Sequence, residues 1–141
     1  MSANASARLY SPQILSLAVR LADYPLDDRQ PLLGEANSRT CGSKVACSLT
    51  LNSGRIAEVG LRVSACAVGQ AAAAIFASHA RGFTESDLAK AEGQLGAWLG
   101  LGGSVPDWPE IELLEPALPF PARHSAILLP WNAALRALCK A

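Results

Sequence analysis

The sequence predicts an α+β domain in which a small antiparallel β-sheet, a β-hairpin with a possible third strand, packs against about four helices. Two observations predict this class. Apolar residues recur at helical spacing near the N-terminus and through the second half of the chain, and apolar and polar residues alternate over 44–63. The 141 residues are a length typical of one domain, so we expect residues 1–141 to form a single unit.

The composition is that of a folded chain without net charge. It is 17% charged and 50% hydrophobic, whereas an average globular chain is roughly 25% charged, so intrinsic disorder is excluded. The 12 Lys and Arg residues balance the 12 Asp and Glu residues. A surface that neutralises phosphates is therefore not expected, and we predict no nucleic-acid partner.

No segment is predicted to enter a membrane. Residues 63–80 carry no Asp, Glu, Lys or Arg, but Ser64, Gln70 and His79 make the stretch too polar for a span. Residues 1–10 lack a basic region followed by an apolar core, so we expect no signal peptide and a cytoplasmic protein. In a reducing compartment the four cysteines favour thiol chemistry, metal ligation or burial over disulfides.

The first predicted element is a helix that begins after Ser11. Serine is a favoured N-cap, and Pro12 follows it at the first helical position. Apolar residues then share one face over a helix of about 12 residues: Ile14, Leu17, Ala18 and Leu21. Residues 25–40 are rich in Asp, Pro, Gly, Asn and Ser without periodicity, so we predict a loop that leads to Cys41.

A β-hairpin is predicted around the turn Asn52-Ser53-Gly54. The residues that share one face are Val45, Cys47, Leu49 and Leu51 before the turn and Ala57, Val59, Leu61 and Val63 after it. Matching these faces requires a loop of three residues, which Gly54 suits, or of five. In either register Cys41 and Cys66 come within a rung or two of each other at the same end of the hairpin.

Three helices are predicted after the hairpin. The alanine-rich run 67–80 is typical of a buried helix that ends at Arg81-Gly82. Thr84 to Asp87 resembles a capping box. The helix that follows it presents one apolar face: Leu88, Ala91, Leu95 and Trp98.

The last helix is predicted to begin near Ala122, after a loop at 100–109 and a short apolar segment, 111–114, that has no assignment. Its predicted core face comprises Ile127, Leu128, Trp131, Leu135 and Leu138. Pro130 lies inside this helix and predicts a kink or a later start, because proline lacks the N–H that the helix would use.

Cys41 and Cys66 are the candidate reactive thiols. Cys66 precedes a helix, whose unpaired N–H groups and dipole favour a thiolate at that end, so we expect a nucleophile or a ligand. Gly42 lets the backbone pass close to whatever Cys41 holds. The alternative is that both are small buried hydrophobic residues. Cys47 is expected in the core, and Cys139 near the chain end is expected to take no part.

His124 is a candidate third ligand. It follows the turn Pro119-Phe120-Pro121, so it could approach the cysteine pair; two cysteines and one histidine form an incomplete zinc set, since structural zinc takes four ligands. Arg123 is either a charge at a helix terminus or the partner of a thiolate. His79 lies near a helix C-terminus, where we expect a surface residue.

Three motifs resemble those of the NifU/IscU-type iron–sulfur cluster scaffold family. They are Cys41-Gly42-Ser43, the run 66–74 (CAVGQAAAA) and the run 120–131 (FPARHSAILLPW). The family has Cys-Gly-Asp, then Gly-Cys-Ala-Ile-Ser with an Ala/Ser run, then Phe-Pro-x-Arg-x-Lys-Cys-Ala-Thr-Leu-x-Trp. The long separation of the last two motifs is similar to the SufU branch. The resemblance covers about residues 8–138 and implies the NifU N-terminal/SufU-like fold.

The resemblance also implies a site that binds iron, an iron–sulfur cluster or, as an alternative, zinc. The family uses three cysteines and an aspartate, of which this chain keeps Cys41 and Cys66. Ser43 stands where the aspartate is expected and Ala126 where the third cysteine is expected. Ser43 and Arg123 are therefore expected beside the cargo, and His124 can act as a ligand only if its turn is irregular.

The partners that the resemblance implies are a cysteine desulfurase and iron–sulfur recipient proteins. Family members are scaffolds rather than enzymes, so we expect no catalysis beyond a sulfurtransferase-like step at Cys66 and Cys41. With two thiolates per chain, a bridged [2Fe–2S] cluster requires a second subunit, which predicts a homodimer. Two alternatives stay open: a thiol-redox or sulfur-relay protein in which the two cysteines close as a disulfide, and an interaction protein of the same fold that binds no metal.

Overall fold

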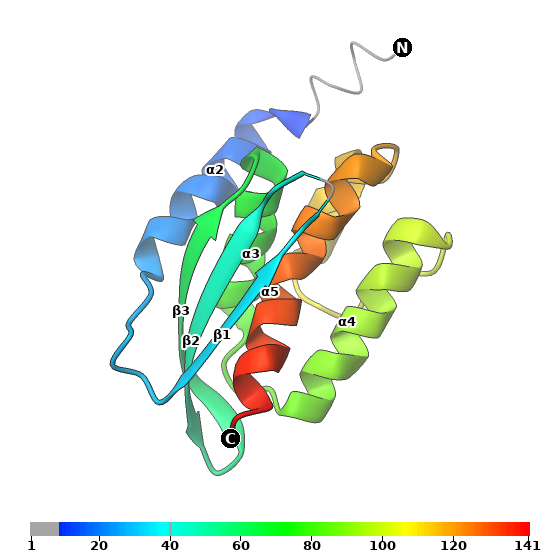
Figure 1. The fold of residues 1–141 in the computed structure, drawn as a ribbon. Coiled ribbons are helices and arrows are strands. Elements are labelled where there is room, and N and C mark those ends of the chain that lie inside the picture. The colour runs from blue at the N-terminus through cyan, green and yellow to red at the C-terminus, as the bar shows by residue number, and fades with distance from the viewer. Residues whose placement is uncertain (1–8, 40) are drawn as a thin grey trace.

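The computed structural model describes residues 9–39 and 41–141. Within them, β1 (Leu32–Asn37), β2 (Lys44–Asn52) and β3 (Arg55–Ser64) form an antiparallel sheet in the order β1-β2-β3. Figure 1 shows the helices gathered on one side of this sheet. The predicted α+β class is confirmed.

The helices form a second layer on the inner face of the sheet. Helices α3 (Ala67–His79) and α5 (His124–Leu138) pack directly on the strands, α3 on β3 and α5 on β1 and β2. Helix α2 (Pro12–Arg20) packs against α3, and α4 (Glu85–Gly100) packs against α5. Among the described residues, no helix combines the length and the apolar character that crossing a bilayer requires.

The hairpin of β2 and β3 is the predicted one, but its loop is shorter than either predicted length. Along most of the hairpin the pairing is that of the five-residue loop, with Leu49 opposite Val59. A bulge next to Thr50 shifts the register, which leaves only Ser53 and Gly54 in the turn. Both have positive φ, 55° and 78°, as a type I′ turn requires. The predicted loop lengths were wrong because an alternating pattern does not reveal a bulge.

Strand β1 lies in the segment 25–40, for which the sequence pattern predicts a loop, so that prediction was wrong for residues 32–37. Its positions alternate between buried and exposed, as in any half-buried strand. The inward positions are Leu32, Gly34 and Ala36. Gly34 and Ala36 are small, so the sequence of this segment shows no recognisable apolar face. Gly34 is required there, because a Cβ would collide with the main chain of α5 at Ala133 and Ala137.

The helices after the hairpin agree with the sequence analysis. Helix α3 is buried along most of its length, and Thr84 and Asp87 form the predicted capping box of α4. Helix α5 begins at His124, later than the predicted start, because the preceding residues form the 3-10 helix η3 (Pro121–Arg123). Pro130 lies inside α5 without ending it. The segment without an assignment belongs to a second 3-10 helix, η2 (Ile111–Ala117).

Four aromatic residues hold the helical layer together. Trp108 stacks on Phe76 and Phe83, with ring centroids 5.6 and 4.6 Å apart. Trp131 meets Phe76 and Trp108 edge-on, both at 5.2 Å. The indole Nε1 of Trp108 also donates a hydrogen bond to the carbonyl oxygen of Ile75. The cluster therefore joins the chain between α4 and η2 to both central helices, in geometries that aromatic pairs prefer.

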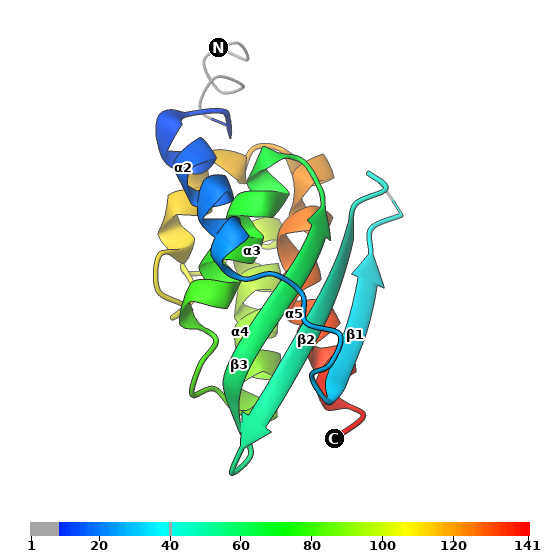
Figure 2. The ribbon, with the colours of Figure 1, turned by 90° about the vertical axis from the view of Figure 1, so that its left-hand side faces the viewer.

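The connection from α2 to β1 crosses the outer face of β3 (Figure 2). The N–H of Leu61 donates to the carbonyl oxygen of Tyr24 at 2.8 Å, and the N–H of Asp27 donates to Oγ of Ser48 at 3.1 Å. Gly60 permits the crossing, because a Cβ there would collide with the carbonyl oxygen of Pro25. The connection thus covers part of the free edge of the sheet.

Replacing Gly34 by alanine is expected to lower the free energy of unfolding by about 1–3 kcal/mol, because the added methyl group forces α5 away from β1. Gly93 is the matched control. It lies in α4 with open space around it, so Gly93→Ala should raise stability by about 0.5–1 kcal/mol through helix propensity. Urea denaturation measures both changes. An unchanged midpoint for Gly34→Ala would show that α5 does not approach β1 this closely.

Candidate thiol site

Cys41 and Cys66 line one cavity of about 250 Å³ at the end of the sheet opposite the β2–β3 turn. Cys41 lies in the connection between β1 and β2, and Cys66 lies between β3 and α3. The other residues that line the cavity are Gly42, Ser43, Ser64, Ala65 and Arg123. The prediction that the two cysteines meet at the same end of the hairpin is confirmed.

A tight turn between β1 and β2 presents the Cys41 side chain to solvent. The N–H of Ser38 donates to the carbonyl oxygen of Ser43 at 2.8 Å, and the N–H of Gly42 donates to the carbonyl oxygen of Ser38 at 3.0 Å. Gly42 has a φ of 71°, which favours glycine. Cys41 is exposed at the tip, whereas Ser38 and Ser43 beneath it are buried.

Serine hydroxyls surround the sulfur of Cys41. Its Sγ lies 3.4 Å from Oγ of Ser38 and 3.0 Å from Oγ of Ser43. The hydroxyl of Ser38 in turn lies 2.6 Å from that of Ser125, in the first turn of α5. Hydrogen bonds from Ser38 and Ser43 stabilise the thiolate and lower the pKa of Cys41 to about 7. At neutral pH a large fraction of Cys41 is therefore the nucleophilic thiolate.

Cys66 is the N-cap residue of α3, as the sequence predicted. Its backbone is extended, and its carbonyl oxygen accepts the first hydrogen bond of the helix, from the N–H of Gln70 at 2.9 Å. Its side chain makes no capping hydrogen bond and is half-buried. The thiol therefore lies beside the N–H groups of the first turn of α3.

The other two cysteines lie outside this cavity. Cys47 has no exposed surface, and burial raises the pKa of its thiol to about 12, which confirms its place in the core. Cys139 is exposed at the C-terminal end of α5.

Arg123 lines the cavity, but His124 does not. The Nε2 atom of His124 lies 3.2 Å from the carbonyl oxygen of Ala117 and 3.1 Å from that of Leu118, so the ring contacts the end of η2. Within the part of the chain that the structure describes, no three His, Cys, Asp or Glu side chains lie together in a way that could hold a metal ion. One chain therefore offers two thiols and several hydroxyl groups.

His79 lies at the opposite end of α3 from Cys66. Its Nε2 atom lies 2.7 Å from a carboxylate oxygen of Glu110, and Arg20 donates to both oxygens of that carboxylate, at 2.7 and 3.2 Å. The hydrogen bond from Arg20 has the largest effect on the carboxyl group of Glu110, and that with His79 the next largest. Together they lower the pKa of Glu110 to about 2. These contacts join α2, α3 and the start of η2, which is a structural role for His79.

The resemblance predicts a ligand at positions 43 and 126, and only the first of these positions lines the cavity. Ser43 lines it directly. Ala126 is buried in α5, and its Cβ lies 3.4 Å from where a Cβ on Gly69 in the first turn of α3 would be. Sequence reasoning missed Ser38 and Ser125, which no local pattern connects because they lie 87 residues apart.

Known structures share this fold. A nitrogen-fixing NifU-like protein (N-terminal) from Brucella abortus matches with a TM-score of 0.88 and 25% identity over 96% of this chain and 96% of that chain. A putative iron–sulfur cluster assembly scaffold protein for the SUF system from Fervidobacterium islandicum AW-1 matches with a TM-score of 0.81 and 20% identity over 92% of this chain and 96% of that chain. No protein-family model and no curated protein matches the sequence. The resemblance inferred from the three motifs is confirmed.

Alkylation should report the different surroundings of the thiols. Cys41 and Cys66 should react at neutral pH more than about tenfold faster than Cys47, whose thiol is buried and protonated. In Ser43→Ala the pH midpoint for alkylation of Cys41 should rise above about 7, because the thiolate loses a donor. Ser86→Ala, at an exposed position of α4, is the matched control and should leave the midpoint unchanged. Iodoacetamide kinetics resolved by mass spectrometry measure both effects, and an unshifted midpoint in Ser43→Ala would contradict the role of the hydroxyl.

Restoring the family ligands should create a strong zinc site. Ser43→Asp combined with Ala126→Cys adds a carboxylate and a third thiolate beside Cys41 and Cys66, which completes a tetrahedral set, so zinc affinity should rise by orders of magnitude. Competition with a chromophoric chelator measures it. The matched control, Ser86→Asp with Ala22→Cys, adds the same groups at exposed positions and should not raise the affinity.

Ser43→Asp alone provides a second test if the buried Ala126→Cys change prevents folding. This variant has three ligands and should bind zinc more tightly than the unmodified chain. No gain in either variant would mean that the geometry of the cavity differs from that of a metal site.

Proposed function

The chain is NifU/SufU-like, and from this premise we propose that it acts in iron–sulfur cluster assembly, with Cys41 as the acceptor of sulfur from a cysteine desulfurase. The observation that carries the proposal is the surroundings of Cys41: an exposed thiol with serine hydroxyls at 3.0 and 3.4 Å and a second thiol in the same cavity. The names of the structural neighbours support the same pathway.

The chemical step is transfer of a sulfane sulfur, the outer sulfur of a persulfide. The Cys41 thiolate attacks the outer sulfur of an R–S–SH group on the desulfurase. A new S–S bond forms at Cys41, and the old S–S bond breaks with its electron pair leaving on the inner sulfur of the donor. The products are a persulfide on Cys41 and a thiolate on the donor, so no external oxidant or reductant is consumed.

The groups around Cys41 suit each stage of this step. The hydrogen bonds with Ser38 and Ser43 lower the pKa of the attacking sulfur to about 7, so a large fraction of it is thiolate at neutral pH. The same donors, together with the positive charge of Arg123 at the cavity, stabilise the anionic form of the persulfide product. Cys66 lines the same cavity and is available as the second thiol when the sulfur is passed on.

Iron or a [2Fe–2S] cluster is the proposed cargo rather than a resident cofactor. Such a cluster takes four thiolates. Two copies of the chain, each with Cys41 and Cys66, would provide these four thiolates and hold the cluster until it is transferred to a recipient protein. Zinc is the alternative ion for the same thiols. We propose that this homodimer forms only with cargo, and that the protein works in the cytoplasm, where its four free cysteines stay reduced.

A thiol-redox relay is the second candidate, and the shared cavity of Cys41 and Cys66 favours it. In that reaction the two thiols lose two protons and two electrons to an oxidised dithiol protein and form one disulfide. The product contains no added sulfur, so mass distinguishes the two candidates.

Incubation with a purified cysteine desulfurase and cysteine should add one sulfur atom to the chain at Cys41. Cys41→Ser should abolish the gain in mass, whereas Cys66→Ser should retain the first transfer. Cys47→Ala is the control: it should accept sulfur normally while losing stability of about 1–2 kcal/mol, as expected for a small buried side chain. Mass spectrometry after alkylation measures the product. Sulfur found only on Cys66, or a loss of two protons with no sulfur gained, would overturn the proposal.

A further inference from the structure

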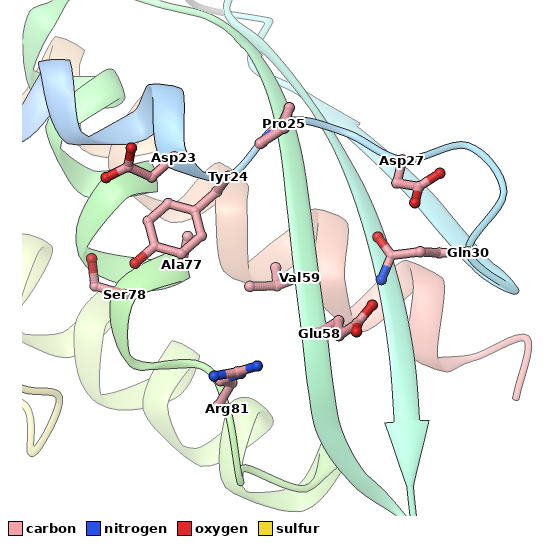
Figure 3. Close-up of a pocket in the computed structure, with 10 residues that line it drawn as sticks. All are labelled: Asp23, Tyr24, Pro25, Asp27, Gln30, Glu58, Val59, Ala77, Ser78 and Arg81. Atoms are coloured by element: carbon pink, nitrogen blue, oxygen red, sulfur yellow. The ribbon is translucent and has the colours of Figure 1, made fainter.

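A second cavity, of about 490 Å³, lies at the C-terminal end of α3, away from the thiols (Figure 3). Its walls come from the end of α3, from β3 and from the connection after α2. It shares no lining residue with the thiol cavity. Because α3 is 13 residues long, the two cavities are separated by about 20 Å along the helix. The proposed sulfur transfer leaves this second cavity without a role.

The cavity exposes main-chain groups of an edge strand. Strand β3 has β2 on one side only. The N–H of Leu61 points away from β2, since it donates to Tyr24, and residues two apart in a strand direct their main-chain groups to the same side. The N–H and C=O of Val59 therefore also point outward, into the cavity that Val59 lines.

The chain itself covers this edge on both sides of Val59. On one side the carbonyl of Tyr24 pairs with Leu61 at 2.8 Å. On the other, Nε of Arg81 donates to the carbonyl oxygen of Ala57 at 2.9 Å, and the N–H of Ile56 donates to the carbonyl oxygen of Phe83 at 2.9 Å. Between these two covered stretches the edge is open for one residue, Val59, and this is where the cavity lies.

The uncovered edge at Val59 has an apolar surface on one face of β3 and an acidic surface on the other. Figure 3 shows the Val59 side chain directed toward Tyr24 and Ala77, which form an apolar wall, and the Glu58 side chain directed the other way, toward Asp27 and Gln30. The outer side thus carries two carboxylates, and the cationic residue that lines the same cavity, Arg81, donates to the carbonyl oxygen of Ala57. The carboxylate of Asp27 forms a salt bridge with Arg29 at 3.1 Å, whereas the carboxylate of Glu58 forms no salt bridge with a described residue. The C-terminal end of α3 adds partial negative charge to the same cavity.

From these observations we propose that the cavity binds an extended segment of a partner protein with the pattern basic, apolar, basic. The segment extends the sheet at the edge of β3 by a single residue, which pairs with Val59. The apolar residue lies opposite Val59 and exchanges both main-chain hydrogen bonds with it, and its side chain packs against Tyr24 and Ala77. Its two neighbours project to the other face, because side chains alternate along a strand, and meet Glu58 and Asp27.

Binding of the blocked peptide acetyl-Gly-Lys-Val-Lys-Gly-amide to the full chain tests the proposal. In ¹⁵N-labelled protein the amide signals of Val59 and Glu58 should shift in a saturable way, and hydrogen exchange of the Val59 amide should slow. Glu58→Lys should weaken binding by about tenfold, as expected when an attractive charge becomes repulsive. Glu112→Lys, an equal charge change at an exposed position outside the cavity, should leave it unchanged.

Changes in the peptide separate strand addition from other kinds of attraction without altering the protein. The frame-shifted sequence Gly-Val-Lys-Val-Gly and the acidic sequence Gly-Glu-Val-Glu-Gly should bind more weakly, as should the Lys-Val-Lys peptide with a methyl group on its valine nitrogen. If the N-methylated peptide binds as tightly as the unmethylated one, charge attraction alone accounts for binding and the proposal is overturned. Tighter binding of spermidine than of the peptide, or no shift at Val59, would also overturn it. None of these outcomes depends on sulfur transfer to Cys41.

Discussion

Helix α5 lies so close to β1 that the strand can carry no side chain at Gly34, where a Cβ would collide with the helix main chain. Further contacts hold the two elements along their length. Arg136 and Lys140 donate to the carbonyl oxygens of Glu35 and Leu33. At the other end the hydroxyls of Ser38 and Ser125 meet at 2.6 Å. Because a helix is stiff, the approach at Gly34 sets where its first turn lies relative to the turn that carries Cys41, and the thiol cavity depends on that placement.

The charge balance of the cavity follows from the residues that this packing brings there. A serine stands at position 43, where the resemblance predicts an aspartate, and an alanine stands at position 126, where it predicts a thiol. Both replacements remove negative charge that would compensate a metal cation. What remains is a set of serine hydroxyls, which lower the pKa of Cys41 to about 7, and Arg123, which lines the same cavity. The cavity of a single chain is therefore better suited to a thiolate or a persulfide than to a bare metal ion.

Helix α3 links the two cavities and gives them opposite electrostatic preferences. Its N-terminus, beside Cys66, directs unpaired N–H groups toward the thiol cavity, which favours an anion. Its C-terminus contributes Ala77 and Ser78 to the larger cavity, where the helix dipole is negative and the lining holds three carboxylates, Asp23, Asp27 and Glu58, and one cation, Arg81. The helix is buried along most of its length, and its Phe76 belongs to the aromatic cluster. One element thus positions both candidate sites.

The sequence by itself determined the elements whose signals are local. The Ser11-Pro12 start, the capping box at Thr84, the alanine-rich α3 and the alternation in β2 and β3 all appear as predicted, because each depends on residues within a few positions of one another. That locality also sufficed to bring Cys41 and Cys66 to one end of a hairpin.

Only the tertiary structure decided the features that depend on distant segments. Strand β1 has glycine and alanine on its inner face because α5 covers it, so its pattern resembles that of a loop until the helix is in place. The direction of the His124 ring depends on η2, which the sequence left without an assignment. The lowered pKa of Cys41 owes a small part to the hydroxyl of Ser125, which also meets that of Ser38, 87 residues away in the sequence. Such contacts form when helices and strands pack, and no pattern within one segment encodes them.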